Sequence, residues 1–249
     1  MIGGFIVTGD ADKNILIRAL GPSLAGAGVP KVLRDPELEL YDSSGTLLDQ
    51  NANWTTLPPG TFPVELQPIE PLEAVISASL PPGNYTAVLR GEGGTTGVAL
   101  CELYDLSPTA SSVRNISTRG QVGVGDDVMI GGFIIGGTAP TQVIVRAIGP
   151  SLVAAGVTGE LVDPVLELHN SDGSLIFRND NWRDDQEQQI IDTTIPPLDD
   201  RESAIVATLP PGAYTAIVGG TNDSTGVALV EVYALGPDPL NGTNLNAKR

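Results

Sequence analysis

Short runs of β-branched or alternating apolar residues follow one another along the whole chain, each bounded by Gly, Pro, Asn, Asp or Ser. Alternation with a period of two residues is typical of a strand with one buried face. The pattern therefore predicts strands almost throughout. In the first half of the chain they fall at Ile2–Val7, Ile15–Ala19, Leu38–Tyr41, Ala74–Ser79, Tyr85–Arg90 and Val98–Tyr104.

Turn residues separate these strands at regular intervals. The segments LELYDSSGTLL and LELHNSDGSLI predict hairpins, because Ser-Gly and Asp-Gly supply positions that tolerate a positive φ. Helical character is confined to GPSLAGAGV and GPSLVAAGV, each long enough for a turn or two. Many short strands with tight turns are typical of a β-sandwich or jelly roll.

An internal repeat organises the chain. MIGGFIVTGD at Met1 returns as MIGGFIIGGT at Met129, and at this shift of 128 positions 29 of the first 54 residues are identical. Later segments match at a shift of 129, such as TGVALCELYDL at Thr96 and TGVALVEVYAL at Thr225. Self-similarity of this kind indicates a duplicated structural unit.

The repeat predicts an all-β protein of two tandem β-sandwich domains, jelly-roll or Ig-like, produced by internal duplication. The first unit is predicted at 1–112 and lacks a leading strand. The second unit, with its leading strand, is predicted at 113–240. The remaining residues, 241–249, form a C-terminal tail.

The amino-acid composition argues against several classes of function. The 13 basic and 30 acidic residues give a net charge of −17, so the chain lacks the clustered positive charge that nucleic acids require. With three lysines in all, an anionic membrane surface is an equally poor partner, and no apolar run is long enough for a spanning helix. We therefore expect no nucleic acid partner and no membrane insertion.

Candidate catalytic residues are sparse. The chain has one His and one Cys, Cys101, which aligns with Val230 in the second copy and so predicts a small buried side chain. The chain therefore lacks the residues from which a nucleophilic catalytic triad is expected to form. Glycosidase chemistry needs two carboxylates, but the acids shared by both copies are expected to face solvent or cap loops: Asp35/Asp163, Glu39/Glu167, Glu73/Glu202 and Glu102/Glu231. We expect no enzymatic activity and no organic cofactor.

Calcium is the one metal that the sequence suggests. One loop of the second copy offers several oxygen donors, which suit a hard cation, although their spacing is not that of an EF-hand. A solvated acidic loop is the alternative interpretation. The candidate ligands are Asn179, Asp180, Asn181, Asp184 and Asp185.

An arginine and a tryptophan recur at fixed places, Arg18/Arg146 and Trp54/Trp182. Such a pair could stack against a sugar and bind surface glycans. Alternatively, the tryptophan closes one end of the sandwich and has a structural role.

The later part of each copy, DPVLELHNSDGSLIFRNDNW followed by ESAIVATLPPGAYTAIVGG and TGVALVEVYAL in the second, resembles the bacterial pre-peptidase C-terminal type of β-sandwich. The whole unit resembles a tandem repeat of large secreted bacterial proteins. The resemblance covers nearly the entire chain. It implies a non-catalytic module in a secreted setting and carries over no catalytic residues.

The segment before the second copy predicts a strand at Val113–Val122 that forms a hairpin with Ile130–Ile135. The first copy has no such segment, so its own first strand would expose an apolar edge at Ile2, Phe5 and Val7. At a shift of 129 the tail aligns with the start of this leading strand. Its candidate donor residues are Asn244, Leu245, Asn246, Ala247 and Lys248.

These features predict strand addition in trans, in which the tail of one molecule completes the first unit of the next. The expected function is a non-enzymatic structural protein, secreted or on the cell surface, that assembles head to tail into a filament or array. The alternatives are a glycan- or surface-binding accessory module, and a passive spacer from a larger secreted adhesin.

Overall fold

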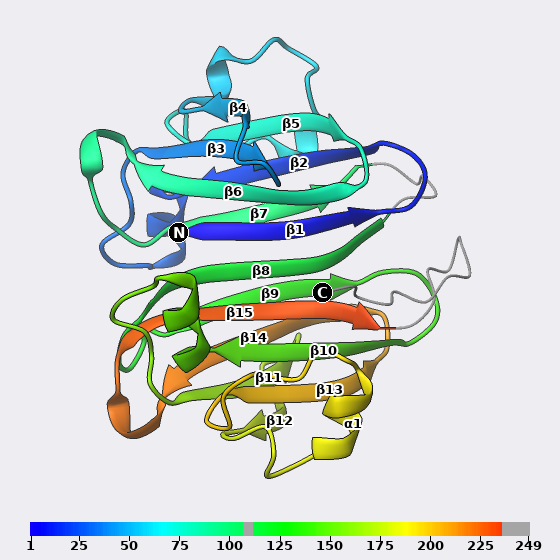
Figure 1. Cartoon of the computed structure of the whole chain (residues 1–249). Helices are drawn as coiled ribbons and strands as arrows, with labels where there is room; N and C mark the ends of the chain where they lie inside the picture. The colour runs from blue at the N-terminus through cyan, green and yellow to red at the C-terminus, as the bar shows by residue number, and fades with distance from the viewer. Residues whose placement is uncertain (107–111, 236–249) are drawn as a thin grey trace. The chain divides into compact units, whose positions relative to one another are not determined.

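The computed structural model of the chain describes residues 1–106 and 112–235 (Figure 1). The chain divides into two compact units, unit 1 (Met1–Arg114) and unit 2 (Asn115–Arg249), a division close to the predicted 112/113 boundary. Both are built from antiparallel strands with short helical turns, so the protein belongs to the all-β class. The tail, 241–249, lies outside the described residues.

Unit 1 contains two sheets. One has the strand order β1-β6-β3-β4 and the other the order β5-β2-β7. The strands are β1 (Ile2–Thr8), β2 (Lys13–Leu20), β3 (Pro36–Asp42), β4 (Leu47–Asn51), β5 (Ala74–Leu80), β6 (Gly83–Gly91) and β7 (Leu100–Asp105). Short 3₁₀ turns connect them at η1 (Pro22–Ala27), η2 (Trp54–Thr56), η3 (Val64–Leu66) and η4 (Glu92–Gly94).

Unit 2 also contains two sheets, with the orders β12-β11-β14-β9 and β13-β10-β15-β8. Its strands are β8 (Ser112–Val122), which starts at the boundary, β9 (Met129–Ile135), β10 (Thr141–Ile148), β11 (Pro164–Asn170), β12 (Leu175–Asn179), β13 (Ser203–Leu209), β14 (Gly212–Gly220) and β15 (Gly226–Leu235). Its turns are η5 (Pro150–Ala155) and η6 (Thr221–Asp223), and it has one described α-helix, α1 (Glu187–Asp192), which the sequence pattern did not predict.

The core of unit 2 lies between its two sheets. Val143 and Val145 of β10 pack in one cluster with Leu166 and Leu168 of β11, from the opposite sheet, and all four side chains are fully buried. The alternate residue Ile144 is also fully buried, because a second cluster under α1 covers the other face of β10. Burial on both faces explains why β10 is apolar at consecutive positions.

The repeated motif GPSL is held by a buried carboxylate. In unit 2, Glu202 Oε1 accepts hydrogen bonds from the N–H of Gly149 at 3.1 Å, the N–H of Ser151 at 2.9 Å and the Ser151 hydroxyl at 2.5 Å. Its Oε2 accepts from the N–H groups of Leu198 and Asp199 at 3.2 and 3.3 Å. A carboxylate removed from water needs such donors. One side chain therefore fixes two loops.

The same arrangement occurs in unit 1. Glu73 Oε1 accepts from the N–H groups of Gly21 and Ser23 and from the Ser23 hydroxyl. Glu73 and Glu202 are both 0% exposed, so of the two expected placements, facing solvent or capping a loop, the structure shows the second. The glycine is required by close packing, because a Cβ at Gly21 would lie 2.1 Å from the Leu33 carbonyl oxygen.

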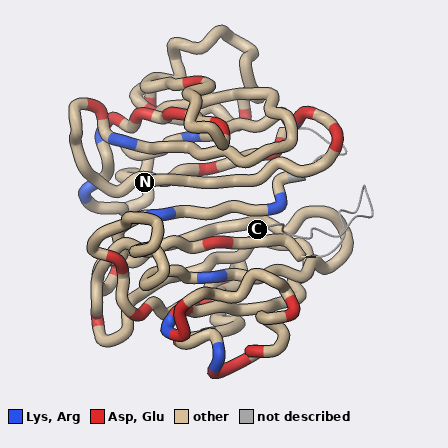
Figure 2. The backbone as a smooth tube through the Cα atoms, viewed as in Figure 1, with Lys and Arg blue, Asp and Glu red and all other residues tan. Residues whose placement is uncertain are grey.

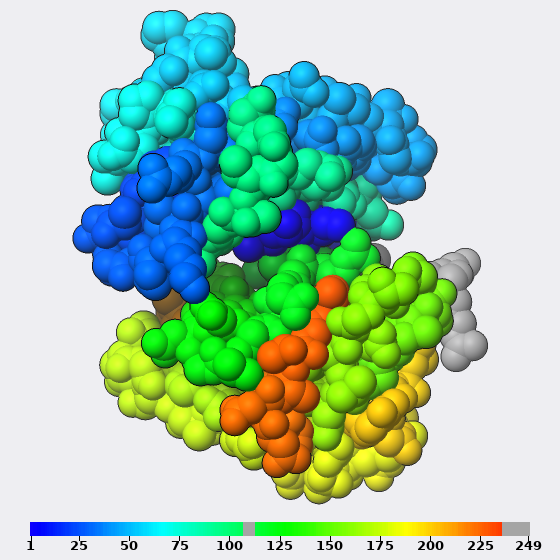
Figure 3. Space-filling model, turned by 90° about the vertical axis from the view of Figure 1, so that its left-hand side faces the viewer, coloured from blue at the N-terminus to red at the C-terminus, as the bar shows by residue number. Residues whose placement is uncertain are grey.

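The loop after β2 also meets the turn that leads into β7. Val32 bridges to Val98, and the N–H of Leu33 donates to the Val98 carbonyl at 2.8 Å. In Figure 3 the two segments, blue and blue-green, meet at the surface of unit 1. Acidic side chains outnumber basic ones in both units (Figure 2).

The predicted hairpin between the leading strand and Ile130–Ile135 is wrong. β8 pairs with β15, from Gly226 opposite Val122 to Tyr233 opposite Asn115, whereas β9 pairs with β14. The chain between β8 and β9 carries the backbone from one sheet to the other, so the two strands belong to different sheets. The expectation that β1 would be an unpaired strand is also wrong, because β1 is hydrogen-bonded to β6.

We expect Glu202→Ala to lower the free energy of unfolding of unit 2 by about 3–5 kcal/mol, because it leaves several buried N–H donors without an acceptor. Urea unfolding followed by Trp182 fluorescence in a Trp54→Phe background measures this loss. Glu187→Ala, which removes an exposed ion pair with Arg183, is the control and should cost about 1 kcal/mol or less. Equal effects of the two substitutions would contradict the bracing role.

Candidate functional site: an open strand edge

The second sheet of unit 1 is one strand shorter than its counterpart in unit 2. β7 pairs with β2 on one side, from Leu100 opposite Leu20 to Asp105 opposite Ile15. The equivalent strand β15 pairs with β10 on that side and with β8 on the other. Within residues 1–106 no strand of unit 1 takes the place of β8, so β7 forms the end of its sheet.

The missing neighbour shortens the strand itself. In unit 2, Gly226, Val227 and Ala228 lie beyond the last pair with β10, and they belong to β15 because β8 pairs with them. The corresponding residues 97–99 lie outside β7. A strand neighbour supplies the backbone partners that keep a segment extended. The difference between the units is therefore a direct consequence of the absent pairing.

Side chains that face the core are also less well covered along β7. Ala228, Val230 and Val232 of β15 are 0%, 3% and 8% exposed. Their counterparts in unit 1, at positions 99, 101 and 103, are all partly exposed. Leu100, on the other face, is 41% exposed. The edge strand β7 therefore has two features. Some of its backbone groups face away from β2, and its apolar side chains are incompletely covered.

The contacts of β8 with unit 2 show how a neighbouring strand covers the edge of β15. Its Val122 is fully buried in the core of unit 2, and Ile116 packs against the same core. Asn115 is 6% exposed, and its Nδ2–H donates to the Val232 carbonyl at 3.1 Å. An incoming strand of this type therefore brings apolar side chains for the core and an amide that fixes its position on the neighbouring strand.

The outward face of β7 is already organised without a neighbour. The guanidinium of Arg18 forms an ion pair with Glu102, donates to the Tyr104 hydroxyl at 3.0 Å and stacks over the Tyr104 ring at 5.0 Å. It also donates to the Leu66 carbonyl at 2.8 Å. These contacts hold β7 against β2 and so fix the conformation of this strand at the end of its sheet.

Unit 2 repeats this group as Arg146, Glu231 and Tyr233. Burial and the nearby Glu231 carboxylate raise the pKa of the Tyr233 phenol to about 12. In unit 1, burial raises the pKa of the Cys101 thiol to about 12, so little reactive thiolate forms near neutral pH. Cys101 lies on β7 opposite Ala19 of β2.

The predicted acceptor residues on β1 have a different role. Phe5 and Val7 are 4% and 1% exposed and belong to the core of unit 1, where Phe5 stacks on Tyr85 with ring centroids 5.4 Å apart. Ile2 lies on β1 opposite Val88 of β6. The strand that ends its sheet among the described residues is β7, and the sequence did not single out its residues Leu100–Tyr104. The donor residues Asn244–Lys248 lie outside the described part of the chain.

The proposed calcium ligands are used for local structure. Asn179 is 5% exposed: its Oδ1 accepts from the N–H of Ala204 at 3.0 Å and its Nδ2–H donates to the Asn181 carbonyl at 3.0 Å. Asn181 donates to the Asp184 carboxylate at 3.0 Å. Asp180 accepts from a threonine hydroxyl, and Asp185 is exposed. Across residues 1–106 and 112–235 no cluster of three His, Cys, Asp or Glu side chains could hold a metal ion.

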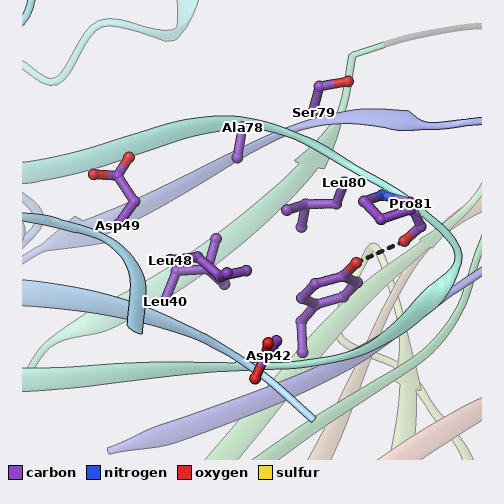
Figure 4. A pocket seen from close by; sticks show the side chains of 9 residues that line it. Leu40, Asp42, Leu48, Asp49, Ala78, Ser79, Leu80 and Pro81 are labelled. Atoms are coloured by element: carbon purple, nitrogen blue, oxygen red, sulfur yellow. Dashed lines mark hydrogen bonds between the residues drawn. The ribbon is translucent and has the colours of Figure 1, made fainter. Parts of the chain in front are cut away.

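Two shallow hollows mark the surface of unit 1. One, of about 380 Å³, has Leu40, Leu48 and Leu80 along its floor and Asp42 and Asp49 at its rim (Figure 4). The other, of about 280 Å³, lies between Trp54 and Phe62, whose rings meet edge to face with centroids 6.4 Å apart. In unit 2 the equivalent Trp182 is 2% exposed beneath α1, which agrees with the structural interpretation for that copy.

No protein-family model and no curated protein matches the chain. Among solved structures, it is similar to a protein from Eubacterium rectale (13% identity, 95% of this chain and 70% of that one, TM-score 0.23). It is also similar to a chain of Sulfolobus Turreted Icosahedral Virus (10%, 92% and 85%, TM-score 0.27) and to a PBCV-1 capsid chain (9%, 91% and 87%, TM-score 0.23). These similarities are too low to support a functional argument. Within the described residues, no helix is both long and apolar enough to cross a membrane.

Proposed function

We propose that the chain is a non-enzymatic, extracellular structural protein whose two β-sandwich units arose by duplication. Its molecules join head to tail by strand complementation at the open edge of β7. The observation that carries this proposal is the contrast between β7 and β15, two copies of one strand: within residues 1–106 and 112–235, β15 has a strand on both sides and β7 on one.

The chain contains a segment suited to this edge. At a shift of 129 the tail residues Asn244–Lys248 align with Asn115–Arg119, the part of β8 that pairs with β15. Leu245 takes the place of Ile116, which packs against the core of unit 2. The tail, 241–249, carries two basic residues and no acidic one in a chain of net charge −17, so its charge favours docking on a second copy.

The energy of such a joint is modest. A donor of five residues makes about five backbone hydrogen bonds, each contributing about 1 kcal/mol net. Burial of one leucine adds about 2 kcal/mol, whereas association costs at least about 4 kcal/mol. Strand addition therefore gives a reversible, concentration-dependent joint, and a durable fibre requires further contact between the sandwiches.

The symmetry of the contact determines the product. Donor and acceptor are different surfaces of the same molecule, so the contact is heterologous and gives an open filament or a closed ring. The high negative charge keeps such assemblies soluble and apart from one another.

Removal of the tail should abolish assembly. We expect negative-stain electron microscopy at 0.15 M salt to show filaments or rings for the full chain, and single particles for a chain that ends at Pro239. Leu245→Asp should weaken assembly at least tenfold in the concentration required, because it places a charge against the core. Glu187→Ala, which alters an exposed ion pair of unit 2 away from the tail and β7, is the control and should assemble. Single particles for the full chain at every concentration would rule the proposal out.

A second candidate is glycan binding at the hollow between Trp54 and Phe62. The half-buried aromatic pair and the surrounding prolines fit a stacking platform for a sugar ring. This function predicts saturable binding that does not depend on the tail.

Titration of the full chain with bacterial surface oligosaccharides, followed by Trp54 fluorescence in a Trp182→Phe background, tests the second candidate. A saturable change that persists in the chain ending at Pro239 and disappears in Trp54→Ala would support it. A fluorescence signal that does not respond to any oligosaccharide would exclude it.

A further inference from the structure

We propose that the hollow of unit 1 drawn in Figure 4 binds a linear aliphatic diamine or polyamine, a ligand whose ammonium groups are joined by methylene chains. The hollow lies where β4, at the end of one described sheet, meets β5, at the end of the other. Its volume of about 380 Å³ is within the range of small-ligand sites. No residue of β7 lines it, so the proposal does not depend on head-to-tail assembly.

The floor of the hollow is apolar. Leu40 of β3 and Leu80 of β5 are 0% and 4% exposed and belong to the core, whereas Leu48 of β4 is 45% exposed. Tyr85 of β6 completes the floor, and its hydroxyl group donates to the Pro81 carbonyl at 2.7 Å. Methylene groups that leave water to lie on this surface contribute favourably to binding.

The first carboxylate at the rim is Asp42, the last residue of β3. Its Oδ1 accepts hydrogen bonds from the N–H groups of Ser44 and Thr46, both at 2.9 Å, and from the Ser44 hydroxyl at 2.6 Å. These bonds, above all those from Ser44, hold the pKa of Asp42 below its usual range, so the group stays ionised in mildly acidic solution. They all end at Oδ1, so Oδ2 can accept from a ligand.

The second carboxylate is Asp49 of β4. It is exposed, and its Oδ1 accepts from the N–H of Gln50 at 2.8 Å. In the view of Figure 4 leucine side chains of the floor lie between Asp42 and Asp49. The residues that line the hollow include no Lys or Arg. Two negative charges separated by apolar surface match a ligand with an ammonium group at each end of a methylene chain.

A third acidic residue lies close to the hollow. Burial raises the pKa of the Tyr85 phenol above its usual value, and the charges of Asp12 and Asp42 raise it further. Asp12 is exposed in the connection between β1 and β2. The three carboxylates therefore create a negative potential around the hollow, which attracts a polycation.

Unit 2 keeps the floor of the hollow and lacks its acids. The counterparts of three floor residues are identical: Leu168, Leu209 and Tyr214. The residues in place of the three acids are Pro140, Asn170 and Phe177. Ile176, at the place of Leu48, packs against the core of unit 2. Because the second unit forms the same sandwich without these acids, folding does not require them, and a ligand gives them a role.

Equilibrium dialysis of the full chain against radiolabelled cadaverine, a five-carbon diamine, at about 0.15 M salt tests the proposal. We expect saturable binding of one cadaverine per chain, displaced by unlabelled spermidine. Pentylamine, which has the same carbon chain and a single ammonium group, should bind at least about tenfold more weakly, because it makes one charge-assisted hydrogen bond where the diamine makes two. Equal affinities would refute recognition by two carboxylates, and a lack of saturable binding would refute the site.

The residues of unit 2 supply a variant that locates the site. Asp42→Asn combined with Asp49→Phe gives unit 1 the residues of unit 2, where Asn170 accepts a backbone hydrogen bond within the same turn. We expect cadaverine binding to weaken at least about tenfold. Glu65→Gln combined with Glu70→Gln is the matched control, because it removes two exposed charges of unit 1 that do not line the hollow.

The control should bind cadaverine as the parent chain does. Equal weakening in the two double variants would show general attraction to an acidic surface and would overturn the proposal, as would unchanged binding after Asp42→Asn and Asp49→Phe. Urea unfolding reports whether each variant is folded. If the Asp42/Asp49 variant is not, the exposed substitution Asp49→Asn alone decides: binding at least about fivefold weaker supports the site, and unchanged binding refutes it.

Discussion

The structure of both units depends on how the backbone N–H and C=O groups at the edges of their sheets are paired. Each strand at the end of a sheet presents N–H and C=O groups that must be paired or solvated, and an apolar edge that stays open is a site for another strand. In unit 2 the edge of β15 is satisfied by β8, and the strand extends to ten residues. In unit 1 the same sequence pattern yields a six-residue strand with partly exposed core positions.

The remaining contacts keep this edge ready for a partner. The buried carboxylate of Glu73 fixes the loop after β2, and Val32 and Leu33 of that loop hold the turn before β7. The Arg18–Glu102–Tyr104 group holds β7 itself. Because these contacts recur in unit 2, where the neighbouring strand is present, the open edge has the shape of a filled one. If a donor strand binds there as proposed, the cost of ordering the edge is therefore small.

Much of the fold could be predicted from local pattern. Alternation located most strands, and the glycine turns of both predicted hairpins have the expected positive φ, at Gly45 and Gly173. Pairing between strands could not be predicted, because period-two patterning fixes which face is buried and not which strand lies alongside. Thus the leading strand was assigned to β9 when it belongs to β15. The buried roles of Glu73 and Glu202 were missed because their backbone donors come from loops distant in sequence.

The edge without a neighbouring strand was predicted at β1 and not at β7 for the same reason. The sequence repeat predicted a leading strand before the second copy, but only the pairing of β8 with β15 shows which edge that strand covers. The signal that could have located it is the match between TGVALCELYDL and TGVALVEVYAL, in which Cys101 replaces the fully covered Val230.

Hydrogen–deuterium exchange along β7 and β15 tests the open edge most directly. In dilute, unassembled protein, peptides that span Leu100–Tyr104 should exchange much faster than peptides that span Leu229–Tyr233. On assembly, β7 should become protected and β15 should not change. If β7 is as protected as β15 in the unassembled protein, or if assembly leaves its exchange unchanged, the edge is not the joint between molecules.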